Sequence, residues 1–167
     1  MALRAIRLNR DPVLYRKCRE VEQVDDKIRQ LLDDMLQTLH ATSNGAAIAA
    51  PQVGVLRRLV VIDMGELSGG VLKLVNPKII HKQGRQVCDE GCLSFPDQWA
   101  QTVRPYQVTV QALDENGKEI QLTGEGELAQ CFCHELDHLD GIVFLQRAIK
   151  TSSAAPSKGR RRQNRKA

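Results

Sequence analysis

The residues best suited to chemistry lie in one short stretch, residues 131–138, which contains the pattern His-Glu-x-x-His. If this stretch is helical, His134 and His138 lie one turn apart on the same face, where both imidazoles can bind one divalent metal ion. Glu135 can then reach a water held at that metal. The alternative is a pair of surface histidines on an amphipathic helix, because a five-residue pattern also recurs by chance. The rest of the chain has to decide between the two.

A catalytic zinc-type site uses three protein ligands and keeps one position for water, so a third ligand is needed. Cys92 is the best candidate, because Gly91 and an acidic pair precede it and a proline follows in the stretch 89–96, where a loop can aim the thiol. Cys131 lies on the same helix face as the two histidines. Three ligands on one helix would lie in a line and could not surround an ion, so Cys131 is expected near the site rather than in it.

Hydrophobic periodicity indicates which elements position these residues. Apolar residues at helical spacing predict a helix over 24–39, and a second helix over 124–139 carries the histidine pattern. Extended segments are expected at 58–63, 71–75 and 78–82, with Asn76-Pro77 dividing the last two. Segments 108–113 and 120–123 flank an Asn-Gly turn and predict a hairpin, and 142–145 is expected to be extended.

Composition limits the classes of protein to which the chain can belong. The chain has 167 residues, of which 42% are apolar and 26% are charged, as in a soluble one-domain protein. No apolar run approaches the ~20 residues of a membrane span, and the N-terminus lacks the features of a secretory signal. Five cysteines without disulfide spacing predict reduced thiols and a cytoplasmic location. Three of them, Cys18, Cys88 and Cys133, are expected to be small buried hydrophobes.

The formal net charge is concentrated at the C-terminus. Six basic residues lie in the last ten positions, and without them the net charge of +4 becomes −2 for the rest of the chain. From residue 151 onward the sequence offers little apolar surface to bury, so residues 151–167 are expected to be a disordered basic tail after a domain of residues 1–150. Such an arm can bind RNA phosphates, and the alternative is a tail that only aids solubility.

Three stretches taken together resemble the three motifs of the peptide deformylase family. They are Gly45-Ala-Ala-Ile-Ala-Ala-Pro-Gln52, Glu90-Gly-Cys-Leu-Ser94 and His134-Glu-Leu-Asp-His138, in the order and at the separations found in the family. The likeness extends over residues 8–147. It implies an α+β fold, with antiparallel β-sheets packed around a central metal-binding helix.

The resemblance also implies an activity and roles for residues. The enzyme would remove the formyl group from the N-terminal formyl-methionine of newly made polypeptides and release formate. Cys92, His134 and His138 would hold one divalent metal ion, usually Fe²⁺ in this family, with Zn²⁺, Ni²⁺ or Co²⁺ also able to occupy such sites. Glu135 would carry the proton from water to the leaving amine. The Gln52 side chain and the Leu93 backbone N–H would stabilise the developing oxyanion.

Substrate contacts follow from the same resemblance. The backbone of Gly45, Ala46 and Ala47 would pair with the peptide, and Ala47 stands where the family usually has glycine. Residues 127, 130 and 131 share the helix face of His134, which helps to line the methionine pocket in the family. This chain has Glu127, Gln130 and Cys131 there, and a weaker preference for methionine is therefore expected unless Glu127 points into solvent.

Two acidic residues in or near the motifs have roles that the sequence leaves open. Glu90 or Asp137 could accept a hydrogen bond from an imidazole or from Arg104, or each could form only a surface ion pair.

The expected partners are nascent formyl-methionyl peptides and, through the tail, the ribosome, with no membrane. The rival functions are a zinc peptidase, which would need a third ligand after His138, and a ribosome- or RNA-bound protein that kept the fold but little activity.

Overall fold

A computed structural model describes residues 2–154. In this part of the chain, two α-helices and eight strands alternate with four short 3₁₀ helices. The α-helices are α1 (Asp26–His40) and α2 (Glu127–Leu139). The strands are β1 (Ala47–Ala49), β2 (Leu59–Asp63), β3 (Val71–Gln83), β4 (Gln86–Cys92), β5 (Phe95–Arg104), β6 (Gln107–Leu113), β7 (Glu119–Glu125) and β8 (Lys150–Ser152). The 3₁₀ helices are η1 (Pro12–Tyr15), η2 (Ala50–Val53), η3 (Gly65–Ser68) and η4 (Phe144–Arg147).

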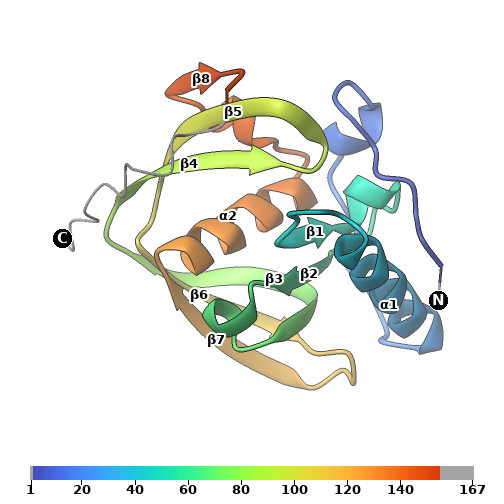
Figure 1. Cartoon of the computed structure of the whole chain (residues 1–167). Helices are drawn as coiled ribbons and strands as arrows, with labels where there is room; N and C mark the ends of the chain where they lie inside the picture. Colours follow the sequence, from blue (N-terminus) through green and yellow to red (C-terminus); the bar gives the residue numbers. More distant parts are fainter. Residues whose placement is uncertain (1, 155–167) are drawn as a thin grey trace.

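The strands form two antiparallel sheets with α2 between them. One sheet has the order β1-β2-β3-β6-β7 and the other has the order β4-β5-β8. In Figure 1, α2 runs between β4 on one side and the larger sheet on the other, while α1 lies beside β1 and β2. The expected α+β class, with antiparallel sheets packed around the helix of the histidine pattern, is confirmed.

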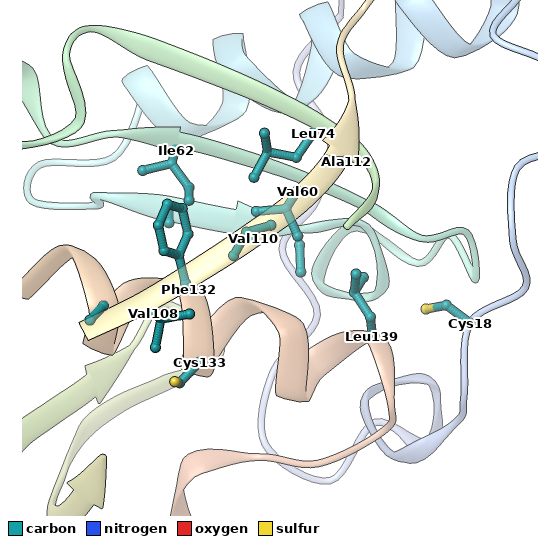
Figure 2. Close-up of a cluster of buried hydrophobic side chains, with 13 residues drawn as sticks. Cys18, Val60, Ile62, Leu74, Val108, Val110, Ala112, Phe132, Cys133 and Leu139 are labelled. Carbon is teal, nitrogen blue, oxygen red and sulfur yellow. The ribbon is translucent and has the colours of Figure 1, made fainter. Parts of the chain in front are cut away.

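The buried face of α2 explains its central position. Ala129, Phe132, Leu136 and Leu139 recur at helical spacing, and all four are buried. In Figure 2 the Phe132 ring points from the helix toward Ile62 and the inner face of the larger sheet. Burial of the phenylalanine and leucine side chains is worth roughly 1.5–3 kcal/mol each, so packing on this sheet fixes the rotation of α2 about its axis.

The start of α2 differs from the helix expected over 124–139. Gly124 and Glu125 belong to β7, where they pair with Val108 and Gln107. Gly126 then has a φ of 58°, a left-handed conformation that glycine adopts readily and that breaks the strand before the helix begins. Helical periodicity continues through the junction in the sequence, which is why the pattern placed the boundary too early.

Strand β3 is also longer than the sequence suggests. It runs unbroken through Asn76-Pro77, although the pairing with β6 shifts register there. Asn76 has a φ of 50°, and its side chain bonds both the N–H and the carbonyl of Val21, at 2.8 Å each. The Asn76 side chain thus links the irregularity to the segment around Val21, and the strand continues on both sides of it.

The C-terminal part of the described chain differs from the expected pattern in two places. Residues 144–147 form the 3₁₀ helix η4 instead of continuing an extended segment from 142. Thr151 and Ser152, expected to be disordered, form β8 and pair with Ala100 and Trp99. Main-chain pairing with β5, the central strand of this sheet, needs no apolar side chains, which is why composition did not indicate it. Residues 155–167 of the predicted tail lie outside the described residues.

In the part of the chain from residue 2 to 154, no helix has the length and apolar content that crossing a membrane requires.

Candidate metal centre and its surroundings

Three side chains suited to metal binding meet where β4 ends above α2. The ligand atoms of Cys92, His134 and His138 all lie within 4.8 Å of one another. Cys92 Sγ is 3.3 Å from His138 Nε2, and the centroids of the two imidazole rings are 5.0 Å apart. One sulfur and two nitrogens at this spacing can surround one ion, which a line of ligands along a single helix could not do. Cys131 is not part of this group.

A buried carboxylate orients the first histidine. Glu90 is 1% exposed, and its Oε1 accepts a hydrogen bond from His134 Nδ1 at 2.8 Å. Arg104 donates to the same carboxylate through Nε at 2.8 Å and Nη2 at 3.0 Å, and Thr102 donates to Oε2. Burial alone would raise the pKa of Glu90, but the hydrogen bonds from His134 and Arg104 lower it to about 2. The carboxylate is therefore ionised and accepts from Nδ1 of His134, so Nε2 is the nitrogen that faces the site.

Both acceptors that the sequence left open are used. Glu90 accepts from His134 and from Arg104, while Asp137 accepts from Arg104 Nη1 at 2.8 Å. Asp137 also accepts from Arg147, through Nε at 3.2 Å and Nη2 at 3.1 Å. These groups form a continuous chain of ion pairs from His134 to η4, with Arg104 buried at its centre.

Glu135 is buried next to the histidines. Its Oε2 has no hydrogen-bond partner among residues 2–154, and its Oε1 is 3.9 Å from His134 Nε2. Burial raises its pKa to about 7, and the nearby Glu90 charge also raises it, while His134 opposes the shift. A buried carboxyl group with an uncommitted oxygen beside a cluster of metal-binding atoms is suited to exchanging protons with water at that place.

His138 is also suited to binding a metal ion. Burial lowers its pKa well below the usual value, so the imidazole is neutral and its nitrogen lone pair is available. The donor set and the free oxygen of Glu135 together fit a divalent ion with a water beside it.

Gln52 is held in one orientation beside the thiol. Its Oε1 accepts a hydrogen bond from Ala49 N at 2.9 Å. This contact directs the amide Nε2 toward the site, where it lies 3.1 Å from Ser94 Oγ and 3.4 Å from Cys92 Sγ. Leu93 follows Cys92 at the turn between β4 and β5.

The small residues 45–47 lie opposite this turn. A Cβ on Gly45 would lie 2.9 Å from Leu39 Cδ1 and 3.0 Å from Leu93 Cδ1, so a larger residue would require the neighbours to move. Ala46 is exposed, and Ala47 begins β1, which pairs with β2 on one side only. In the described part of the chain, the other edge of β1 has no strand beside it, and Ile48 and Ala49 on β1 are fully buried.

Comparison with known proteins agrees with this geometry. The polypeptide deformylase family matches residues 3–154. Peptide deformylase 2 of Clostridium acetobutylicum is 64% identical over 144 residues, which cover 86% of this chain and 94% of that protein. Peptide deformylase of Agathobacter rectalis is 50% identical over 147 residues, covering 88% and 90%. The chain belongs to the peptide deformylase family.

Solved peptide deformylase structures have the same fold. The enzyme of Ehrlichia chaffeensis, crystallised in complex with actinonin, superposes with a TM-score of 0.86 at 42% identity, covering 90% of this chain and 91% of that one. The enzyme of Legionella pneumophila gives a TM-score of 0.83 at 40% identity, covering 87% and 86%. The chain is therefore a metal-dependent hydrolase that removes the formyl group from the N-terminus of new polypeptides. Neither the zinc peptidase nor a fold that has lost its activity is favoured.

The three residues expected in the methionine pocket of this deformylase lie on the first turns of α2. Glu127 is exposed, whereas Gln130 is partly buried and its Nε2 donates to the Asp89 carbonyl on β4 at 3.3 Å. Cys131 is partly buried, and burial raises the pKa of its thiol well above the usual value. The exposure of Glu127 agrees with the alternative in which it points into solvent.

Two aromatic contacts at the site were not expected from the sequence. The Phe144 ring lies against His134, with centroids 5.8 Å apart and planes tilted by 30°. Trp99 lies over Gly91, next to Cys92, and a Cβ on Gly91 would be 2.7 Å from the indole ring. Glycine is therefore needed before the cysteine because of close packing. The signals available in the sequence, a lone tryptophan and a phenylalanine after the histidine motif, do not specify these partners.

Proposed function

We propose that Cys92, His134 and His138 bind one divalent metal ion and that the native ion is Fe²⁺. The proposal is supported by the grouping of one thiol and two imidazoles within 4.8 Å. A bound ion of this kind supplies a Lewis acid that polarises the formyl oxygen and makes water more acidic. Zn²⁺, Ni²⁺ and Co²⁺ also accept this ligand set, and the thiolate lowers the net charge of the centre compared with three neutral imidazoles.

Glu135 carries the proton in this proposal. Its buried Oε2, without a partner in the described chain, takes a proton from the attacking water and gives it to the departing amine. The new C–O bond forms at the formyl carbon, and breaking of the C–N bond releases formate and the free methionyl amino group. Burial keeps the pKa of Glu135 near the pH at which both transfers have to occur.

Gln52 and Leu93 stabilise the negative charge on the formyl oxygen. The hydrogen bond from Ala49 N holds the Gln52 amide with its N–H₂ group toward Cys92. This orientation exists before the substrate binds, so little reorganisation is needed when charge develops. The backbone N–H of Leu93 is the second donor.

The substrate binds as an extended peptide along the free edge of β1. Residues 45–47 supply the main-chain groups, and Gln130 and Cys131 lie toward the methionine side chain, while the exposed Glu127 points into solvent. The enzyme acts in the cytoplasm on nascent peptides, and the basic residues beyond 154 bring it to the ribosome. The support for this last step is the concentration of positive charge in the last ten residues.

X-ray absorption at the metal edge, on anaerobically purified protein, tests the metal centre. We expect one divalent ion per chain with one sulfur and two nitrogen ligands, and formate release from formyl-Met-Ala-Ser by the same sample. Absence of a sulfur scatterer would reject Cys92 as a ligand. The Cys131→Ser variant is the matched control, because its thiol lies nearby but outside the ligand group, and it should keep the sulfur signal.

A further inference from the structure

We propose that η4, the 3₁₀ helix that follows α2, is a positioning element for the metal centre and acts on His134 through Phe144 and Arg147. Neither side chain belongs to the ligand group. The inference rests on the metal site proposed above, and it assigns to the segment after the histidine motif a role in setting the geometry of that site.

The first route from η4 to His134 is direct packing. Phe144 is 1% exposed, and its ring lies against the imidazole of His134, at a centroid distance of 5.8 Å. The Phe144 ring is itself held by Phe95 of β5, whose ring packs edge-to-face against it at a centroid distance of 5.8 Å and an angle of 75°. The His134 ring is thus held between Glu90 at Nδ1 and a buried aromatic face, and rotation about its side-chain bonds would break both contacts.

The second route is electrostatic. Arg147 donates two hydrogen bonds to Asp137, which lies three residues after His134 on α2. Asp137 accepts from Arg104, and Arg104 donates to Glu90, the residue that accepts from His134. Arg147 therefore fixes the outer end of the same chain of ion pairs whose inner end orients the imidazole.

The path of the chain keeps η4 in this place. Gly141 has a φ of 74° and lies so close to the backbone of Tyr15 that a Cβ would be 2.7 Å away, and there the chain reverses after α2. Gln146 Oε1 then accepts from Val143 N at 2.9 Å, which closes the 3₁₀ turn on itself. The segment continues into β8, which is paired with β5 (Figure 1). A rigid element fixed at both ends can set the position of a neighbouring ligand, whereas a mobile one could not.

The test compares metal affinity in variants of η4. Phe144→Leu keeps an apolar side chain but removes the flat face against His134, and we expect metal affinity to fall by about tenfold, as is typical when a group supporting a ligand is lost. The visible spectrum of the Co²⁺-loaded protein should shift, because the angle between His134 and Cys92 changes. Once the protein is fully loaded, the KM for formyl-Met-Ala-Ser should change less than kcat.

Two controls separate positioning from a loss of stability. Phe132→Leu makes the same substitution on the opposite side of α2, where the ring packs on the larger sheet, and it should lower the unfolding temperature while leaving the Co²⁺ spectrum unchanged. Arg147→Gln removes a half-exposed side chain without a core cavity, so it should fold even where Phe144→Leu does not. Arg147→Gln should lower metal affinity, as Phe144→Leu does. Arg29→Gln, which breaks an exposed ion pair on α1, should leave metal affinity unchanged.

The outcomes are distinct. If Phe144→Leu and Arg147→Gln bind metal as tightly as the wild type and give the same Co²⁺ spectrum, η4 has only a structural role and the inference is wrong. If Phe144→Leu does not fold, Arg147→Gln alone decides. If the wild type itself shows no sulfur and nitrogen ligands, the metal site fails first, and this result is distinguishable from the failure of η4.

Discussion

Replacement of Glu90 by glutamine should weaken both the fold and the metal site. Glu90 accepts from His134 with one oxygen and from Arg104 with both, and glutamine has only one acceptor oxygen. Whichever way the amide is turned, one N–H of Arg104 then faces the amide N–H₂ group, because Arg104 donates to both carboxylate oxygens. The buried guanidinium of Arg104 also loses a full negative charge, which in buried ion pairs costs roughly 3–5 kcal/mol of stability. For a domain of this size, that loss corresponds to a fall in unfolding temperature of about 6–20 °C.

The measurement has two parts. Denaturant unfolding of the metal-free protein gives the change in the free energy of unfolding without the contribution of bound metal. Chelator competition gives the metal affinity, which should fall by about 10–100-fold because the acceptor that orients His134 is no longer charged.

Asp34→Asn is the matched control. Asp34 is also a buried carboxylate paired with an arginine, Arg4 at 3.0 Å, but it lies on α1 away from the metal centre. The Asp34→Asn variant should have a lower free energy of unfolding and an unchanged metal affinity. If Glu90→Gln unfolds within about 1 kcal/mol of the wild type and keeps its metal affinity, the buried ion pair does not set the geometry of His134, and the reasoning from its contacts is refuted.

Four further outcomes are expected. Glu135→Gln should keep the metal but lower kcat by about 10²–10⁴-fold, and near-normal turnover of a fully loaded variant would remove it from the mechanism. Gln130→Leu should raise the preference for formyl-Met over formyl-Gln peptides by up to ~1–3 kcal/mol, while Glu127→Leu should change it little because Glu127 is exposed; equal effects in kcat/KM would contradict this difference. The metal-free protein should lose stability as the pH falls from about 4.5 toward 2, because the folded state holds the pKa of Glu90 at about 2 and the unfolded chain takes up its proton earlier; acid titration of Glu90→Gln should give a shallower decline. Deletion of residues 155–167, which leaves β8 intact, should preserve turnover of a short formyl peptide and reduce pelleting with ribosomes at ~50 mM salt, and equal pelleting would leave the basic residues without a role in nucleic-acid binding.

The structure brings Cys92, His134 and His138 together, and the sequence could predict this for the two histidines because helical spacing restricts geometry. Two histidines four residues apart must lie on one face of α2, whatever surrounds them. The expectation that Cys92 is the third ligand depended on the resemblance to a family as well, since no local pattern places Cys92 against α2. That position results from the β4–β5 hairpin, whose register only the fold establishes.

The surroundings of the site were predicted less completely, for physical reasons. Glu90 and Asp137 were recognised as possible acceptors, but their partners are set by long-range packing. The contact of Phe144 with His134 depends on the chain reversal at Gly141, which hydrophobic periodicity does not encode. The strand β8 was missed because its pairing uses the main chain, and side-chain composition carries no information about it.

The packing of Trp99 on Gly91 gives this enzyme a built-in optical probe. Trp99 is the single tryptophan of the chain, so all tryptophan emission comes from one ring that touches the residue before Cys92. We expect occupation of the centre by an ion with an open d shell, or oxidation of the thiol, to change the quenching of that emission. Metal loading and damage by oxygen can therefore be followed in the unlabelled protein, in real time and under anaerobic conditions.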